Sequence, residues 1–283
     1  MTKVYPERSR RTTSVKERGL WRWIVIALFL TFMIVPFLAT VLFSISVRWD
    51  RTIFPEGLTL EWWDKVTSRS AFETTLTNSF IVSLATMFAL AVLVTPTAYW
   101  AHIRIPRSKS LIEFLTIIPF GIPGVVLALA LIRLYSTVPL PLINTPSILV
   151  AACMVIALPF MYRPVANSLE AIDIHVLTEA AQSLGAGWWK TMIRVIVPNI
   201  LPGIISGCLL VFSTVFAEFT LANLLVGTRF KTFPIYLVEF TRFDGRQASA
   251  LAVISFVIAW LTSLLILWIA GRGGRPAESL GAR

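Results

Sequence analysis

The chain of 283 residues is 56% hydrophobic and 14% charged, and its mean hydropathy is +0.77. A water-soluble domain cannot solvate a surface of that composition, so these values indicate an integral membrane protein. The net charge of +10 does not indicate nucleic-acid binding, because the basic residues stand at the ends of apolar runs, where the membrane surface is the expected counter-ion.

Six apolar stretches are long enough to cross the hydrocarbon core of a bilayer, which takes about 20 helical residues. The sequence therefore predicts an all-α polytopic membrane protein with about six transmembrane helices. We expect these helices at approximately 22–46, 77–101, 111–133, 147–166, 201–226 and 247–270. The first apolar run is too long for a signal peptide and lacks a small-residue cleavage pattern, so we interpret it as an uncleaved anchor.

The expected spans divide the chain into five parts. These are a basic tail at 1–21, a first transmembrane helix at 22–46, a segment at 47–76, a core with five helices at 77–270 and a second tail at 271–283. Lys and Arg accumulate in the first tail and in the short connection at 104–109, which favours a cytoplasmic N-terminus. With six crossings, both tails are then cytoplasmic and the 47–76 segment is external.

The external segment mixes acidic side chains with Trp49, Trp62 and Trp63. Tryptophan prefers the headgroup level, where its ring body lies in the apolar boundary and its indole N–H faces water. We expect this segment to lie at the outer membrane surface, either as a simple anchor or in contact with a soluble partner.

The third expected span begins with Pro119, Gly121, Pro123 and Gly124. The two prolines remove backbone donors, so this helix is expected to bend or unwind within the membrane. Broken helices often line substrate paths in transporters, but proline is also common in ordinary transmembrane packing. Pro119 and Pro123 are therefore candidates for the substrate path.

A polar connection at 167–200 separates the fourth and fifth spans, where a few residues would suffice. Asn167 or Ser168 is expected to cap a helix that stops at Gly185. A second helix should run from Trp188 to about Val195 and end at Pro198. The sequence thus predicts a helix–turn–helix lying across the membrane surface.

The fifth span contains Glu218, with Thr220 and Asn223 close behind it. A carboxylate at that depth is costly in hydrocarbon, so it should face protein or a water-filled cavity. It is a candidate for contact with a cationic cargo. The alternative is that Glu218 pairs with a neighbouring helix for structural reasons.

The connection at 167–200 also carries a recognisable pattern. Glu179, Ala180 and Ala181 are followed after three residues by Gly185, and after nine more by the run Val195-Ile196-Val197-Pro198. This resembles the cytoplasmic signature of the membrane subunits of binding-protein-dependent ATP-binding-cassette importers. The alternative is an amphipathic loop that anchors on lipid, which explains Trp188 and Trp189 but leaves the spacing to chance.

The resemblance implies a MetI-like permease core in the bacterial inner membrane. It implies that the 167–200 connection couples the permease to two ATPase subunits through Glu179, Ala180, Ala181, Gly185 and Pro198. It further implies a second homologous permease, forming a heterodimer, and a periplasmic solute-binding protein. The chain has no Gly-x-x-x-x-Gly-Lys-Ser/Thr loop, so we expect no bound cofactor and no ATPase site of its own.

The run from Glu218 to Leu225 most resembles the spermidine/putrescine permease branch, so a polyamine is the first expectation for the cargo. Permeases for thiamine, ferric iron and 2-aminoethylphosphonate are similar and stay open as alternatives. A secondary transporter driven by an ion gradient is the rival from another class, although it would want paired intramembrane carboxylates. No metal site is expected, because His102 and His175 stand far apart and Cys153 and Cys208 lie singly in apolar runs.

Overall fold

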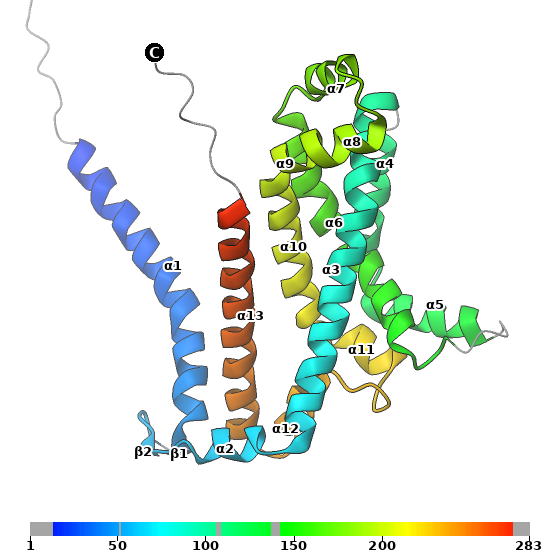
Figure 1. Cartoon of the computed structure of the whole chain (residues 1–283). Helices are drawn as coiled ribbons and strands as arrows, with labels where there is room; N and C mark the ends of the chain where they lie inside the picture. Colours follow the sequence, from blue (N-terminus) through cyan, green and yellow to red (C-terminus); the bar gives the residue numbers. More distant parts are fainter. Residues whose placement is uncertain (1–13, 51, 106–108, 137–141, 274–283) are drawn as a thin grey trace, which may run out of the picture.

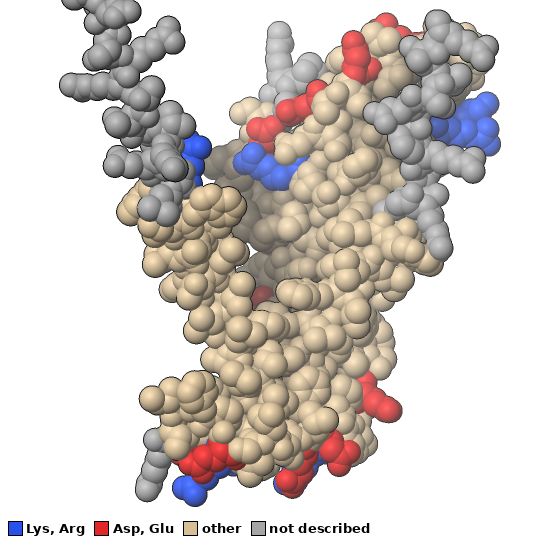
Figure 2. Space-filling view, turned by 90° about the vertical axis from the view of Figure 1, so that its left-hand side faces the viewer, with Lys and Arg blue, Asp and Glu red and all other residues tan. Residues whose placement is uncertain are grey.

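The computed structural model describes residues 14–50, 52–105, 109–136 and 142–273, and most of these residues are helical (Figure 1). Charged side chains gather mostly at the two ends of the molecule, and its middle is almost free of them (Figure 2). This distribution fits a protein that crosses a bilayer. Most of the predicted cytoplasmic tails, 1–21 and 271–283, lies outside the described residues.

Four helices are long and apolar enough to cross a membrane, and they confirm four of the predicted spans. Hydropathy located them because each is a continuous apolar run of at least 18 residues. They are α1 (Ser14–Ser44), α3 (Ser70–Arg104), α6 (Pro146–Glu170) and α13 (Gly245–Gly273).

The third predicted span is broken at its prolines. It consists of α4 (Lys109–Ile117), a 3-10 turn η2 (Ile118–Gly121) and α5 (Gly124–Ser136), and the two helices meet at an angle of 97°. The predicted bend is confirmed, and the segment forms two helices where a straight span would have one. The helix cannot continue straight because the ring and the missing N–H of Pro119 and Pro123 disrupt the backbone ladder.

The fifth predicted span, 201–226, is wrong as one helix. Its membrane part, α10 (Leu201–Phe216), has 16 residues and is about 24 Å long, which is short of the roughly 30 Å hydrocarbon core. The chain turns after Phe216 and forms the short α11 (Thr220–Leu225), which ends at Gly227 with a positive φ of 49°. The helix pair that bends at α10 is instead the helical run Trp188–Asn199 with Leu201–Phe216, at 76°. Counting this pair and the α4–α5 pair as one crossing each brings the described helices to as many as six spans.

A close crossing of α6 and α10 is at the centre of the fold, where α3 also packs on both helices. Gly203 and Gly207 lie four residues apart on α10 and face α6. A Cβ on Gly203 would overlap Ser168 Oγ and lie 2.5 Å from the Pro164 carbonyl oxygen. Small residues at this spacing let two membrane helices approach closely, which is how dispersion contacts hold such bundles together.

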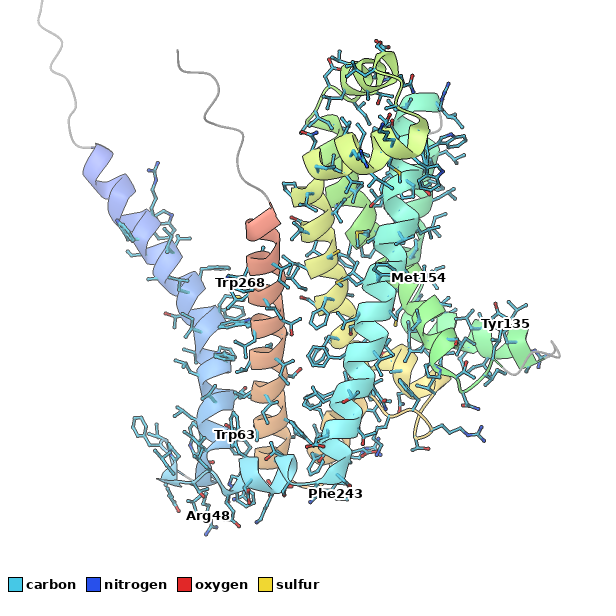
Figure 3. The ribbon with its side chains drawn as sticks, viewed as in Figure 1. Arg48, Trp63, Tyr135, Met154, Phe243 and Trp268 are labelled. Atoms are coloured by element: carbon cyan, nitrogen blue, oxygen red, sulfur yellow. The ribbon has the colours of Figure 1, made fainter. Side chains whose placement is uncertain are left out.

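The opposite end of the molecule from the 167–200 connection holds small elements that hydropathy does not predict. These elements are the antiparallel strands β1 (Ser46–Arg48) and β2 (Glu56–Leu58), the short α2 (Glu61–Thr67) and α12 (Phe233–Thr241). Figure 3 places Arg48, Trp63 and Phe243 at this end. The part of the chain that the structure describes is therefore all-α apart from one two-stranded hairpin.

Two of the predicted interfacial tryptophans tie this end to α1 and its hairpin. Trp62 Nε1 donates to the Ser46 carbonyl at 2.9 Å, and Trp63 Nε1 lies 3.3 Å from Ser44 Oγ. Arg246 lies over the Trp62 ring and donates to the Val47 carbonyl at 2.6 Å. Burial alone would raise the pKa of Asp244, but hydrogen bonds from Arg246 and Gln247 bring that pKa below its usual value.

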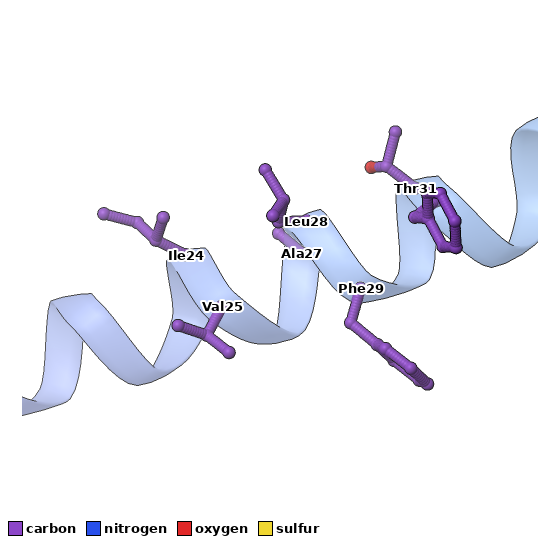
Figure 4. Close-up of a pocket in the computed structure, with 7 residues that line it drawn as sticks. Ile24, Val25, Ala27, Leu28, Phe29 and Thr31 are labelled. Atoms are coloured by element: carbon purple, nitrogen blue, oxygen red, sulfur yellow. The ribbon is translucent and has the colours of Figure 1, made fainter.

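The N-terminal half of α1 stands apart from the bundle (Figure 1). The side chains drawn in Figure 4 all come from this one helix, so they line an open apolar face and not an enclosed cavity. Closer to the other end, Phe37 contacts Phe256 and Trp260 of α13, with ring centroids 5.7 and 6.2 Å apart. This helix has the exposed apolar surface of the membrane anchor that the sequence predicts.

Replacing Gly203 by Ala should push α6 and α10 apart, because the new methyl group meets backbone that cannot move aside. Overpacking of this kind costs about 1–3 kcal/mol, so the thermal denaturation midpoint of the purified protein should fall by several degrees. Gly121→Ala is the matched control, since a Cβ there meets nothing within 4 Å. Equal stability of the two variants would contradict the close crossing.

Candidate functional site

The end of the molecule that carries α7 (Ile174–Ser183) also holds the start of α4 and the end of α3 (Figure 1). The chain leaves α6 after Glu170, and Asp173 caps α7 by accepting the Val176 amide at 3.2 Å. The predicted cap at Asn167 or Ser168 is wrong. Both residues lie inside the last turns of α6, which continues because Leu169 is fully buried in the core.

One face of α7 is buried against the protein and the other is open. Ile174, Thr178 and Ala181 lie on the buried face, at spacings of four and three residues. The open side carries Val176, Glu179, Ala180, Gln182, Ser183 and Leu184. The resemblance places Ala181 among the coupling residues, but Ala181 is only 6% exposed and its methyl group packs inside this chain.

Gly185 ends α7 in the way that the sequence predicts. Its φ is +76°, the left-handed conformation that favours glycine. The amides of Gly185 and Ala186 donate to the carbonyls of Gln182 and Ala181, at 2.8 and 3.0 Å. This is a Schellman cap, and it leaves Leu184 projecting from the tip with 89% of its surface exposed.

The second helix of the connection runs further than expected. It comprises α8 (Trp188–Thr191), a π-helical turn η3 (Met192–Ile196) and α9 (Val197–Asn199), and it meets α10 at 76°. Pro198 therefore lies inside the helical run, and the chain turns only at Ile200. A π-helical turn lies directly before Pro198 and accommodates it in the helical run. In this turn the Val197 amide donates to the Met192 carbonyl, five residues back.

A buried polar contact fixes α7 to the long helix α3. Tyr99, which is fully buried, places its hydroxyl 3.1 Å from Thr178 Oγ1. The Tyr99 ring also lies against Trp188 of α8, with centroids 5.8 Å apart. Both helices of the connection therefore contact one side chain of α3.

His102 fills the corner between α3 and α6 close to this contact. Its Nδ1 lies 2.7 Å from the Ala98 carbonyl, and its Nε2 lies 3.9 Å from Glu170 Oε1. Within the described ranges, no group of three or more His, Cys, Asp and Glu side chains could hold a metal ion. His102 is thus a packing residue of the α3–α6 corner, and His175 is exposed on α7.

The surface of α8 differs from that of α7. Trp189 and Ile193 are exposed beside the basic Lys190 and Arg194, which is the composition of a helix at a membrane interface. The two interpretations of the 167–200 connection therefore fit different halves of it. The tip of α7 presents a mixed polar and apolar knob, and α8 presents an interfacial face.

The candidate path residues lie around the junction of α5, α10 and α11. Glu218 stands in the break between α10 and α11, where its Oε1 accepts the Leu221 amide at 2.9 Å. Thr220 is half-buried beside Gly124 of α5, and Asn223 is exposed. Pro119 lies in η2 and Pro123 at the start of α5.

Sequence reasoning missed Tyr99, Thr178 and Leu184. Nothing in an apolar run distinguishes Tyr99, since a buried tyrosine looks the same with or without a hydroxyl partner. Leu184 did carry a signal. An apolar residue directly before a glycine that stops a helix occupies the cap position and tends to project outward.

Residues 96–272 match the model of the family described as binding-protein-dependent transport system inner membrane component. The chain is 30% identical over 267 residues to the spermidine/putrescine transport system permease protein PotB of Escherichia coli (strain K12), covering 88% of this chain and 94% of the relative. It is 25% identical over 258 residues to the putative 2-aminoethylphosphonate transport system permease protein PhnV of Salmonella typhi, covering 90% and 95%.

Two solved structures share the fold. A chain of a bacterial ABC transporter involved in the import of the acidic polysaccharide alginate superposes with a TM-score of 0.69 at 17% identity, covering 93% of this chain and 99% of that one. A chain of the MetNI methionine ABC transporter in an inward-facing conformation gives a TM-score of 0.59 at 17% identity, covering 75% and 98%.

Tyr99→Phe and Thr178→Val should each destabilise the protein by about 1–2 kcal/mol, because each leaves the other hydroxyl buried without its partner. The double variant should cost less than the sum of the two, since it removes both groups. Thermal denaturation of the purified variants measures this. Thr97→Val, which removes an exposed hydroxyl two residues before Tyr99, should be near neutral. Strict additivity would contradict the contact.

Proposed function

The chain belongs to the family of inner membrane components of binding-protein-dependent transport systems, and from that premise we propose that α7 is the site where an ATPase subunit docks. The chain is a permease subunit of an ABC importer. The observation that carries the proposal is the exposed tip of α7, where Glu179, Ala180 and Leu184 project from a helix that is otherwise fixed to the bundle.

The mechanism needs an exposed projection to which a partner subunit binds, which is the knob at the tip of α7. It also needs a rigid contact that transmits the movement of the knob to the transmembrane helices. The knob combines an exposed leucine with a carboxylate, which suits a partner groove with an apolar floor and a basic or amide rim. The rigid contact is the Tyr99–Thr178 pair and the packing of Trp188 on the same ring. A shift of α7 then moves α3 directly.

ATP binding and hydrolysis belong to the partner subunits. Closure of two ATPase subunits would draw their two docked knobs together and tilt the attached bundles, so that the cavity between two permeases opens to the other side. We propose that this permease pairs with a different, homologous one, and that a periplasmic binding protein delivers the solute. Both termini lie in the cytoplasm in this arrangement.

The cargo that the relatives support best is a polyamine such as spermidine or putrescine. PotB is named for both solutes, and PhnV is named for 2-aminoethylphosphonate. All three solutes carry a primary ammonium group, so a cargo with an ammonium group is consistent with both relatives. Thiamine and ferric iron are the remaining alternatives within the same kind of permease.

Gly185→Asp should abolish uptake in vesicles that contain the assembled transporter, ATP and the binding protein, and it should weaken ATPase association without affecting membrane insertion. The reason is that the substitution strains a backbone with positive φ and adds a charge beside the knob. Uptake of labelled putrescine and co-purification of the ATPase subunit measure the two effects.

Gly187→Asp is the matched control, because Gly187 has a negative φ and caps α8, a position that Asp favours. It should retain ATPase binding. Normal ATPase binding by the Gly185 variant would refute the docking site. Uptake that continues without ATP but with a proton gradient would instead support the rival secondary transporter.

Single cysteines at the two ends should be labelled from opposite sides of the membrane. In a background without Cys153 and Cys208, we expect Phe243→Cys to react with a membrane-impermeant maleimide in intact spheroplasts. Leu184→Cys should react only after permeabilisation. Both side chains are highly exposed, at 84% and 89%, so access to the reagent is not limited by the protein itself. The reverse pattern would overturn the orientation.

A further inference from the structure

The break between α10 and α11 is held by side chains that reach across it. Glu218 accepts the Leu221 amide with Oε1, which satisfies a donor that the short α11 leaves open. On the neighbouring α3, Asn78 donates to the Lys231 carbonyl at 2.9 Å, and Ser79 Oγ accepts the Phe233 amide at 2.8 Å. Groups from α3 therefore hold the start of α12 beside this break.

Thr232 does not do what its position predicts. It is the N-cap residue of α12, where a threonine hydroxyl normally accepts a backbone amide of the first turn. Here it makes no such bond, and Pro234 at the second position of the helix has no amide hydrogen to offer. Thr232 is only 4% exposed, and its Oγ1 has no hydrogen-bond partner among the described residues.

The unpartnered hydroxyl lines a small pocket together with Glu218. The other polar groups around it are Ser79 and Cys153, and the rest of the wall is aliphatic. The space open to the centre of a water molecule is about 10 Å³. That is close to the smallest volume that holds one water, and a buried water needs two to four polar partners.

We propose that one water molecule bound in this cavity bridges the Glu218 carboxylate and the Thr232 hydroxyl. The water donates to the free carboxylate oxygen of Glu218 and accepts from the hydroxyl of Thr232. Ser79, whose oxygen already accepts the Phe233 amide, has its own proton to donate to the same water. The oxygen atoms of Glu218, Thr232 and Ser79 then all have hydrogen-bond partners, which is what a buried position requires.

This assignment makes Glu218 a positioning residue. Its carboxylate turns inward to the junction of α3, α10, α11 and α12, and it is occupied by the Leu221 amide and by the water. The bridge fixes α11, and α5 packs on α11. The inference goes beyond the proposed function, because ATPase docking on α7 does not depend on it.

The test compares isosteric variants by the thermal denaturation midpoint of the purified permease complex. Thr232→Val keeps the shape but removes the hydroxyl, and it should lower the midpoint by about 2–5 °C. Thr232→Ser keeps the hydroxyl, so this variant should have the same midpoint as the unmodified protein. Combining Thr232→Val with Glu218→Ala should lower the midpoint no further than Glu218→Ala alone, because either change removes a partner of the same water.

Thr241→Val is the control, since it removes an exposed hydroxyl at the other end of α12. An unchanged midpoint for Thr232→Val, or additive effects of the Thr232 and Glu218 variants, would overturn the bridge. An experimental map that resolves waters should show one within hydrogen-bond distance of both residues. A solute ammonium in that place would overturn the assignment and make Glu218 a cargo ligand.

Discussion

A helix that stops inside a bilayer leaves amide and carbonyl groups that lipid cannot satisfy, and the architecture of this permease depends on how those groups are accommodated. Two of the spans that hydropathy predicts as continuous are interrupted, at η2 and after Phe216. At the second interruption, side chains supply hydrogen-bond acceptors for open backbone amides. Glu218 accepts an amide of α11 and Ser79 accepts an amide of α12. The short helices around it are stable only because the longer ones surround them.

The long spans were predictable because an apolar run of sufficient length has few other stable solutions. The breaks were harder to predict. Prolines indicated the bend at η2, but the stop after Phe216 lies in a run that stays apolar, and Glu218 looks the same in a sequence whether it faces cargo or caps a helix. The hairpin and α12 were missed because both are shorter than the window that hydropathy needs. The four-residue spacing of Gly203 and Gly207, in contrast, was readable and was overlooked.

The 167–200 connection shows a similar division. Gly185 was predicted correctly, because few residues other than glycine end a helix with a positive φ. The start of α7 was misplaced by several residues, since Asn167, Ser168 and Asp173 are all good caps and only the burial of Leu169 decides among them. The resemblance places Ala181 on the coupling surface, but its side chain is buried, because small residues serve close packing on either face of a helix. Burial, which a single sequence does not reveal, settled each of these points.

The length of α3 links the two ends of the molecule through one helix. Tyr99 meets α7 close to one end of this helix, and Ser79 holds the start of α12 about 30 Å away along the same axis. A stiff rod in contact with both places acts as a lever. A tilt of about 5° displaces one contact relative to the other by about 3 Å, by simple geometry over that length. A movement of the α7 end of α3 therefore reaches the α12 end without a relay of side-chain rearrangements.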